Sequence, residues 1–298
     1  ALWEIFEGVI SDLSKQGLVT LQGVYGSLSE KVTGIVNRPY DHVVVDEAQD
    51  IGPIQLKFLA ALAGAQPNGL FFAGDLGQRI FQQAFSWKSM GVEVRGRSKT
   101  LKINYRTSHQ IRSQADKLLG PEVSDADGNT EERKGTVSVF NGQSPLIREF
   151  ANQAKEIEAV AKWLQDRIQA GVTPSEVGVF VRSSAELPRA QAALEKAGIP
   201  YKSIDAKVAL TSGYATAGTM HLAKGLEFRA VAVMACDDEV IPSQARIEGI
   251  TDDSDLEEVY NTERHLLYVA CTRARDFLMV SATENASEFL MDLNQIRP

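Results

Sequence analysis

The chain has 298 residues, with 31 basic and 39 acidic side chains and a formal net charge of −8. A content of 44% hydrophobic and 23% charged residues is that of an ordinary globular protein and excludes a fibrous or disordered chain. No run reaches the ~18 apolar residues of a membrane span, no signal-peptide pattern is seen, and the two cysteines lack CxxC spacing, so we expect a cytoplasmic protein without a membrane partner.

The charge is unevenly divided along the chain. Residues 1–120 hold 13 basic and 11 acidic side chains, whereas residues 121–298 hold 18 and 28. Residues 79–117 contain nine basic side chains and only two acidic ones, Glu93 and Asp116. Such a segment can bind phosphates on an acidic protein, because the local field governs the contact; a solvated charged face is the alternative that stays open.

Short apolar runs and helical periodicity alternate along the chain. Continuous apolar runs predict strands buried on both faces at residues 42–47, 69–75 and 176–183. Apolar stripes predict helices at residues 55–63, 155–168 and 187–196, and a further strand follows at 199–204. This alternation predicts an α/β fold with a mostly parallel sheet.

A polar, turn-rich stretch without apolar periodicity separates two parts of the chain. We therefore predict a first lobe at residues 1–120, a linker at 121–134 and a second lobe at 135–298.

Two of the predicted strands end in acidic residues, Asp46-Glu47 and Asp75. Ligands of open parallel sheets bind beyond the carboxyl ends of the strands. An acidic pair there fits a magnesium-phosphate reaction, in which one carboxylate holds the metal through water and its neighbour orients the attacking water. Taken alone, the pair could equally be a solvated loop.

Five segments occur in a fixed order: VVVDEAQD (43–50), AGDLGQRIF (73–81), LKINYRT (101–107), TMHLAKGLEFRAV (219–231) and ERHLLYVACTRAR (263–275). In order and spacing they resemble motifs II to VI of the UvrD/Rep-like family of superfamily 1 DNA helicases, over nearly the whole chain. The resemblance implies two RecA-like parallel-sheet lobes with ATP and Mg²⁺ in the cleft between them.

The resemblance also implies roles for five phosphate-facing residues. Asp46 would hold magnesium, Glu47 would activate the hydrolytic water, and Gln78 would contact the γ-phosphate. Arg106 and Arg273, one from each lobe, would approach the same phosphate. Guanidinium groups in a closed cleft stabilise the charge that hydrolysis develops.

Three further matches concern the nucleotide. Tyr105 resembles the residue that stacks on adenine, and a half-buried core tyrosine is the alternative. Gly225 and Glu227 belong to the KGLEF segment, where Glu227 matches the position that meets the ribose; a pair with Lys224 is the alternative.

The resemblance places single-stranded DNA, or a single/double-strand junction, on a second set of residues. Thr219 and His221 match DNA-contacting positions of motif V, although a histidine there can also be purely structural. Phe81, Phe85 and Trp87 follow motif III, where relatives stack aromatics on bases. The segment IFQQAFSW departs from the family's Tyr and Trp two residues apart, so which ring meets a base stays open, and each could belong to the core.

Other chemistries find little support. The four histidines and two cysteines share no metal-ligand spacing, and neither GxSxG nor a GxGxxG after a strand occurs. The acidic run at 252–258 lacks the glycine and ligand spacing of a calcium loop. We interpret it as a solvated face, with Glu257 and Glu258 opening the helix that carries residues 260–273.

The sequence contains no GxxxxGK[ST] motif, the loop that cradles the phosphates in P-loop enzymes. We interpret the chain as the core of an ATP-dependent DNA helicase or translocase whose first lobe is incomplete. The missing N-terminal motor half would lie in the same or another chain, and these residues alone should turn over little or no ATP. The alternative is an ATPase-dead nucleic-acid-binding or adaptor module on the same fold.

Two structural expectations follow from this interpretation. The first lobe should lack a central strand, which leaves unpaired sheet edges. We expect compensation by another chain, by residues 2–28 folding across the gap, or by partial disorder. About ten residues separate the strand ending at Ile204 from Thr216, so the 2B-type insertion of larger relatives should be absent or vestigial.

Overall fold

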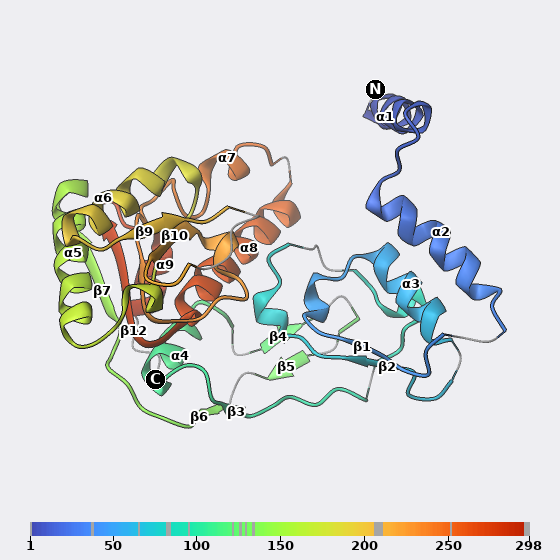
Figure 1. Ribbon diagram of the computed structural model, residues 1–298, viewed down its shortest axis with the longest axis horizontal. Helices are drawn as coiled ribbons and strands as arrows, with labels where there is room; N and C mark the ends of the chain where they lie inside the picture. The colour runs from blue at the N-terminus through green and yellow to red at the C-terminus, as the bar shows by residue number, and fades with distance from the viewer. Residues whose placement is uncertain are drawn as a thin grey trace. The chain divides into compact units, whose positions relative to one another are not determined.

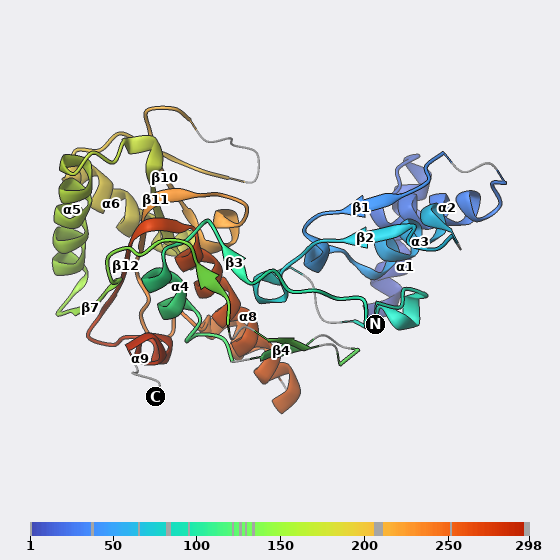
Figure 2. The same cartoon turned by 90° about the horizontal axis from the view of Figure 1, so that it is seen from below.

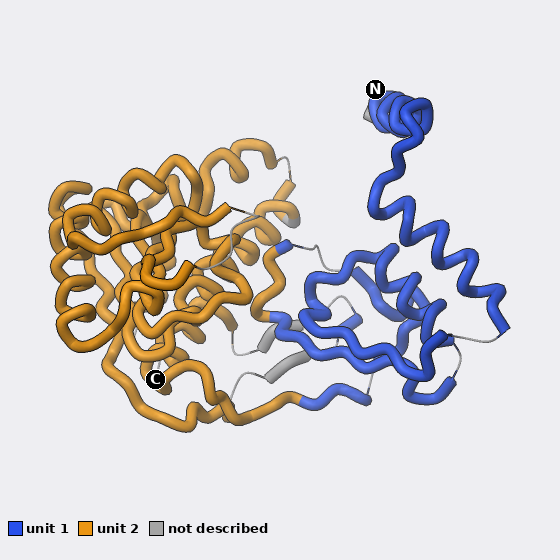
Figure 3. The backbone as a smooth tube through the Cα atoms, viewed as in Figure 1, with its two compact units in different colours: residues 1–76, 81–99, 124–130 blue, residues 77–80, 100–123, 131–298 orange. Residues whose placement is uncertain are grey.

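The computed structural model describes residues 2–36, 39–64, 66–81, 85–94, 96–120, 122–124, 127–128, 130–132, 135–205, 211–250 and 252–294. The chain divides into two compact units (Figure 3), here called unit 1 (residues 1–76, 81–99 and 124–130) and unit 2 (residues 77–80, 100–123 and 131–298). None of the helices in the described ranges combines the length and hydropathy that crossing a membrane requires.

Unit 1 contains a two-stranded parallel sheet and three α-helices (Figure 1). Its elements are α1 (Leu2–Lys15), α2 (Leu21–Thr33), β1 (Val43–Val45), the 3₁₀ turn η1 (Ala48–Asp50), α3 (Pro53–Ala63), β2 (Leu70–Phe72) and the 3₁₀ turn η3 (Lys88–Met90). Both predicted strands and the predicted helix of this unit are confirmed. Helix α2 packs against α3, with the rings of Tyr25 and Phe58 5.5 Å apart.

The two strands of unit 1 are not buried on both faces, which corrects the prediction. Val44 lies opposite Phe71 in the sheet, and these side chains are 73% and 63% exposed. Successive strand residues point to opposite faces, and α3 packs against β1 and β2, so Val44 and Phe71 share the face that α3 does not cover. A run of three apolar residues does not reveal how many faces are covered.

Unit 2 contains a six-stranded sheet in the order β7-β12-β11-β8-β10-β9, with every neighbouring pair parallel. Its strands are β7 (Leu146–Phe150), β8 (Val177–Val181), β9 (Tyr201–Ser203), β10 (Ala215–Thr219), β11 (Phe228–Val233) and β12 (Ala274–Thr283). Strand β8, one of the predicted runs, is buried along its whole length. The sheet confirms the predicted α/β fold with parallel strands.

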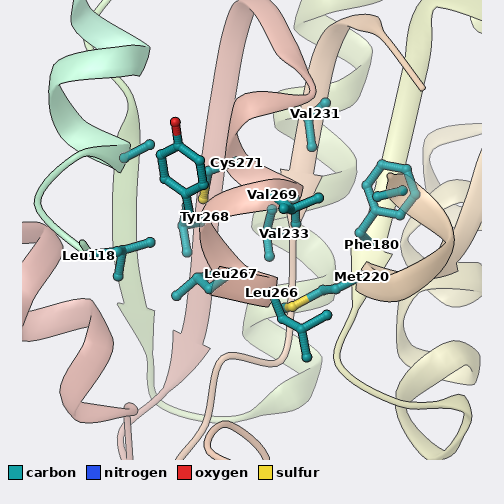
Figure 4. Packing of buried hydrophobic residues seen from close by; sticks show 14 of the residues in the cluster. Leu118, Phe180, Met220, Val231, Val233, Leu266, Leu267, Tyr268, Val269 and Cys271 are labelled. Atoms are coloured by element: carbon teal, nitrogen blue, oxygen red, sulfur yellow. The ribbon is translucent and has the colours of Figure 1, made fainter. Parts of the chain in front are cut away.

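Helices cover both faces of this sheet (Figures 1 and 2). Helices α5 (Gln153–Gln169) and α6 (Leu187–Ala197) pack against each other on one face; α4 (His109–Ala115), α8 (Asp253–Thr272) and α9 (Glu288–Asn294) pack on the other. Figure 4 shows the hydrophobic core between the sheet and α8, where Leu266 and Val269 of α8 lie against Val231 and Val233 of β11. This packing fixes the end of α8, after which Arg273 follows.

Residues 100–123 pack with unit 2, whereas the sequence-based division assigns residues up to 120 to the first lobe. Strand β3 (Ile103–Asn104) pairs with β6 (Val137–Ser138), and α4 packs on α8 and β12. The predicted linker contains two short strands, β4 (Glu122–Ser124) and β5 (Thr130–Glu132), that pair with each other.

The connection between β9 and β10 consists of residues 204–214, of which 206–210 lie outside the described residues. Its length agrees with the expected absence of a 2B-type insertion at this place. The short helix α7 (Gln244–Ile247) and the 3₁₀ turns η2 (Leu76–Gln78), η4 (Pro174–Glu176), η5 (Ser184–Glu186) and η6 (Met220–Ala223) complete the described elements.

Candidate nucleotide and DNA site

The predicted acidic pair lies in unit 1, directly after β1. Asp46 and Glu47 are exposed, and Asp46 Oδ1 accepts a hydrogen bond from the backbone amide of Glu47 at 2.8 Å. Glu47 has a left-handed backbone, with φ of 51°, immediately before η1. Non-glycine residues seldom adopt this conformation, and where they do it is often at functional turns.

Gln49 joins the ends of the two strands of unit 1. Its buried side chain donates from Nε2 to Glu47 Oε2, and its Oε1 accepts from the Asp75 amide at 3.0 Å. A Cβ at Gly74 would lie 2.5 Å from Gln49 Oε1, so a larger residue there would displace the Gln49 side chain. Gln49 belongs to the VVVDEAQD segment, but no role was predicted for it from the sequence. Its spacing of two residues from Glu47, across a turn, was the available signal.

An open hollow of about 340 Å³ lies beside the acidic pair in unit 1. It is lined by Tyr25, Val45, Asp46, Glu47, Asp50, Ile51, Gln55, Phe58 and Leu59. Carboxylates and apolar rings therefore meet at the carboxyl end of β1, where the sheet geometry predicts a ligand site.

Arg273 lies in unit 2 at the junction of α8 and β12 and is only 2% exposed. Its Nε donates to Val269 O at 3.0 Å and its Nη1 to Leu226 O at 3.4 Å. Its Nη2 donates to Gln78 Oε1 at 3.1 Å. The structure thus brings together two of the five predicted phosphate-facing side chains.

The segment that carries Gln78 is fixed to unit 2 at several points. Lys224 Nζ donates to Gln78 O at 2.7 Å, and His265 Nδ1 lies 3.2 Å from Arg79 O. Ile80 is buried in the core that α8 shares with the sheet. Lys224 and His265 were not assigned these roles from sequence, because their contacts join residues far apart in the chain.

The LKINYRT segment (residues 101–107), which resembles motif IV, also lies in unit 2. Asn104 Oδ1 accepts from the amides of Arg106 at 2.8 Å and Thr107 at 3.1 Å, which shapes the turn after β3. Arg106 forms an ion pair with Glu227 through Nε and Oε1. Tyr105 is 72% exposed, so the alternative of a half-buried core tyrosine does not hold.

The KGLEF segment forms the other side of this ion pair. Gly225 has a φ of +79°, a left-handed conformation that side-chain-bearing residues rarely adopt. Lys224, offered as the alternative partner of Glu227, donates instead to the Gln78 carbonyl, while Glu227 pairs with Arg106. Residues from motifs III, IV, V and VI therefore contact one another in pairs on unit 2.

Thr219 and His221 lie at the carboxyl end of β10 and in the following η6 turn. Burial lowers the pKa of His221, and the cations Arg182 and Arg246 lower it further, opposed in part by Glu263. His221 is accordingly a neutral hydrogen-bonding group near pH 7.

These two arginines share one buried carboxylate. Arg182 donates from Nε and Nη2 to the two oxygens of Glu263, both at 2.5 Å, and Arg246 Nη1 donates at 2.9 Å. Glu263 belongs to α8 and is fully buried. The bidentate pair fixes the start of the motif VI segment against the end of β8.

The aromatic residues after motif III lie in unit 1 and differ in exposure. Phe81 is 54% exposed, whereas Phe85 and Trp87 are half-buried. The Trp87 ring packs edge-on against Phe72 of β2, with centroids 4.8 Å apart. Phe81 therefore has the more accessible ring, whereas the Trp87 ring packs against β2.

The acidic run at 252–258 opens α8, as expected. Asp252 Oδ1 accepts from the Asp255 amide at 3.1 Å, which places it at the helix start. Among the described residues no group of three or more histidine, cysteine or acidic side chains is arranged to hold a metal ion.

Two family models match the chain. The model of the UvrD-like helicase C-terminal domain matches residues 99–210 and 216–285, and that of the UvrD/REP helicase N-terminal domain matches residues 11–88. The chain belongs to the UvrD-like helicase family. The UvrD/Rep-like resemblance carried by motifs II to VI is confirmed.

Several curated relatives are named as DNA helicases. The chain is 28% identical to a probable DNA helicase of Mycoplasma pneumoniae over 80% of this chain and 43% of that protein. It is 26% identical to DNA helicase IV of Escherichia coli, over 87% of this chain and 36% of that protein, and 26% identical to DNA helicase II of Haemophilus influenzae, over 55% and 22%. The chain therefore spans less than half the length of these relatives.

One solved structure, the C-terminal domain of a possible DNA helicase from Lactobacillus plantarum, aligns with 64% of this chain and 95% of its own. The TM-score is 0.44 and the sequence identity 23%.

Proposed function

We propose that this chain forms the motor core of an ATP-dependent DNA helicase or translocase that moves on single-stranded DNA. The observation that carries the proposal is the hydrogen bond between Arg273 and Gln78, together with the Arg106–Glu227 ion pair. Four residues with predicted nucleotide roles, drawn from four separate motifs, contact one another in two pairs on unit 2. Membership of the helicase family supports the same activity.

In this proposal the acidic residues of unit 1 supply the metal and water functions. Asp46 is an exposed carboxylate with one oxygen engaged by an amide, a donor suited to hydrated Mg²⁺, which keeps most of its waters. Bound magnesium would neutralise charge on the phosphate oxygens. Glu47 orients the attacking water, and Gln49 holds its carboxylate in place through Nε2.

Arg106 and Arg273 stabilise the negative charge that develops on the γ-phosphate. Arg273 exchanges its hydrogen bond to Gln78 for one to a phosphate oxygen. The partner of the Gln78 side chain therefore changes when the phosphate is present. Arg106 likewise leaves Glu227, which turns to the ribose, while the exposed ring of Tyr105 stacks on adenine. Arginine contacts of this kind raise phosphoryl-transfer rates by ~10³–10⁵ in other enzymes.

The reaction also needs a Walker A loop, and the sequence has no GxxxxGK[ST] motif. We propose that a segment outside residues 1–298, in the same or another chain, supplies it, and that residues 1–298 alone hydrolyse ATP at a negligible rate. The backbone amides of that loop would cradle the phosphates and its hydroxyl would complete the magnesium shell.

Single-stranded DNA binds at motif V and at the aromatic segment of unit 1. Thr219 and neutral His221 offer hydrogen bonds to the strand, and Phe81 and Trp87 offer stacking surfaces. Stacking contributes about 1–3 kcal/mol per base without sequence preference. The interaction is therefore expected to tolerate any sequence and to weaken with salt.

The test is DNA-stimulated ATP hydrolysis by a polypeptide that joins residues 1–298 to a Walker A segment, with the variant Glu47→Gln. The isosteric amide cannot polarise water, so turnover should fall at least ~100-fold while nucleotide binding persists. Glu30→Gln, on the exposed side of α2, is the matched control and should leave turnover unchanged.

Turnover that survives Glu47→Gln would refute the role of Glu47. Absence of turnover in the parent polypeptide, with single-stranded DNA binding intact, would favour the alternative of an ATPase-dead nucleic-acid-binding or adaptor module.

A further inference from the structure

Asp127, within the predicted linker, reaches back to the aromatic segment that follows motif III. Its Oδ2 accepts from the backbone amides of Trp87 at 2.7 Å and Lys88 at 3.0 Å. Its Oδ1 accepts from Ser86 Oγ at 2.5 Å. Three hydrogen bonds to three successive residues converge on one carboxylate, and all four residues belong to unit 1.

This carboxylate caps two backbone amides at the start of a helical turn. The 3₁₀ turn η3 begins at Lys88, and the residue at its N-cap position is Trp87, whose side chain makes no capping hydrogen bond. Amides at the start of a helical turn have no partner within the turn, and a carboxylate is a favoured acceptor for them. Asp127 fills this role from 40 residues further along the chain.

The contact also fixes the Trp87 side chain. The backbone of Trp87 is held by Asp127, and its ring packs edge-on against Phe72 at 4.8 Å. Ser86 is tied to the same turn, because its Oγ accepts from the Ser89 amide at 3.0 Å. The backbone anchor and the ring contact together hold Trp87 against the sheet.

We propose that Asp127 is a positioning residue for single-stranded DNA binding, which holds Trp87 in the orientation that stacks on a base. This inference rests on the DNA-binding part of the proposed function. The charge of Asp127 works in the opposite direction, because an acidic side chain near the strand repels phosphates. Removing the carboxylate would strengthen binding if charge alone mattered, and should weaken it if position matters.

The experiment uses residues 1–298 carrying Trp3→Phe and Trp163→Phe, so that Trp87 is the sole tryptophan. Affinity for a fluorescein-labelled oligothymidylate of about 16 nucleotides is measured by anisotropy in four proteins: the parent, Asp127→Ala, Trp87→Ala and the double variant. Trp87 emission and thermal unfolding are recorded for each protein that retains the ring. Asp12→Ala, an exposed acidic residue of α1, controls for the change in charge.

Asp127→Ala should weaken DNA binding about fivefold to tenfold and shift Trp87 emission to longer wavelength. In the Trp87→Ala background the same change should have no further effect, because Asp127 acts through that ring. Asp12→Ala should leave binding unchanged or slightly tighter.

Equal weakening in both backgrounds, or unchanged binding and emission, would overturn the inference. If Asp127→Ala unfolds unit 1, Asp127→Asn is used instead. It keeps one acceptor oxygen for the amides of Trp87 and Lys88 and loses the charge, so binding should be unchanged or slightly tighter with unchanged Trp87 emission, and weaker binding with unchanged emission would overturn the inference. Failure of the parent protein to bind the oligonucleotide would instead contradict the DNA-binding part of the proposed function, whatever the emission of Trp87 shows.

Discussion

The predicted site residues of unit 1 and those of unit 2 are supported by their surroundings in different ways. In unit 2, Arg273, which is predicted to face the phosphate, is buried and donates a hydrogen bond to the backbone of α8. The sheet of this unit has six strands and is covered by helices on both faces. In unit 1 the acidic pair is exposed and follows a two-stranded sheet whose Val44 and Phe71 are also exposed. There the side chain of Gln49 links the ends of the two strands, from Glu47 to the Asp75 amide.

This difference predicts which substitutions should affect stability. The groups of unit 2 are pre-organised by a large core, so their substitution should change chemistry and stability together. The acidic residues of unit 1 contribute little to packing, so their substitution should change chemistry alone. Substitutions in the two units test this contrast.

The same substitution in the two sheets should have very different effects. Phe180 of β8 is fully buried against Phe228, with ring centroids 5.7 Å apart, whereas Phe71 of β2 is exposed. We expect Phe180→Ala to lower the free energy of unfolding by about 3–5 kcal/mol and Phe71→Ala by no more than about 0.5 kcal/mol. Urea unfolding of both variants is the measurement, and similar losses would contradict the contrast.

A matched pair on α5 tests the polar interior of unit 2. Glu156 is buried and accepts from Arg189 Nε, from Ser281 Oγ at 2.6 Å and from the Ala235 amide at 3.0 Å. Glu156→Gln replaces an acceptor oxygen by a donor and leaves Arg189 less well paired, so the free energy of unfolding should fall by about 3 kcal/mol.

Glu158, two residues further on and exposed, is the control for this change, and Glu158→Gln should have no measurable effect. A variant at Glu156 as stable as the control would show that the buried network is dispensable.

We expect His221 to make a smaller contribution to stability, one that depends on pH. Its pKa is lowered in the folded state by burial and by Arg182, relative to an ordinary value of 6.5. The unfolded chain therefore binds a proton more readily, and stability present at neutral pH is lost as the pH falls below about 6.5 and through the folded pKa.

Replacement His221→Asn should remove this part of the dependence, so that the variant loses less stability than the parent between pH 7 and pH 5. Denaturation at both values provides the comparison, and parallel losses in the two proteins would contradict the lowered pKa.

The reactivity of the two buried cysteines measures how often unit 2 opens, without any substitution at the cysteines themselves. Cys236 and Cys271 are buried, and burial raises the pKa of Cys271 to about 12. Neither thiol should react with an aromatic disulfide reagent in the native protein at pH 8. Phe180→Ala should accelerate the reaction and Phe71→Ala should leave it unchanged; acceleration by Phe71→Ala would show that the two units do not open independently.

Much of the fold could be predicted from local patterns. The apolar runs at β1, β2 and β8 and the apolar stripes of α3, α5 and α6 specify secondary structure within a few neighbouring residues. The exposure of Val44 and Phe71 could not be predicted, since it depends on which elements cover the sheet. The packing of residues 100–123 with unit 2 likewise arises from the pairing of β3 with β6 and of α4 with α8.

The candidate site divides in the same way. The motifs identified Gln78, Arg106, Glu227 and Arg273 as residues with nucleotide roles, and that assignment stays a prediction. The resemblance placed Gln78 and Arg273 at the same phosphate, but it did not indicate the hydrogen bond between them. Nor could the sequence indicate that Asp127 caps the turn at Trp87, because this contact joins residues distant in the chain. Such pairings are decided by the tertiary fold.

The most direct test of the central claim is a double-mutant cycle on Gln78 and Arg273. DNA-stimulated ATP turnover is measured for Gln78→Ala, Arg273→Ala and the double variant, in the polypeptide that joins these residues to a Walker A segment. If both side chains act on the same γ-phosphate, each single variant should lose most of the rate, and the double variant should be little slower than Arg273→Ala, with a coupling of at least about tenfold. Independent, multiplicative losses would contradict the account.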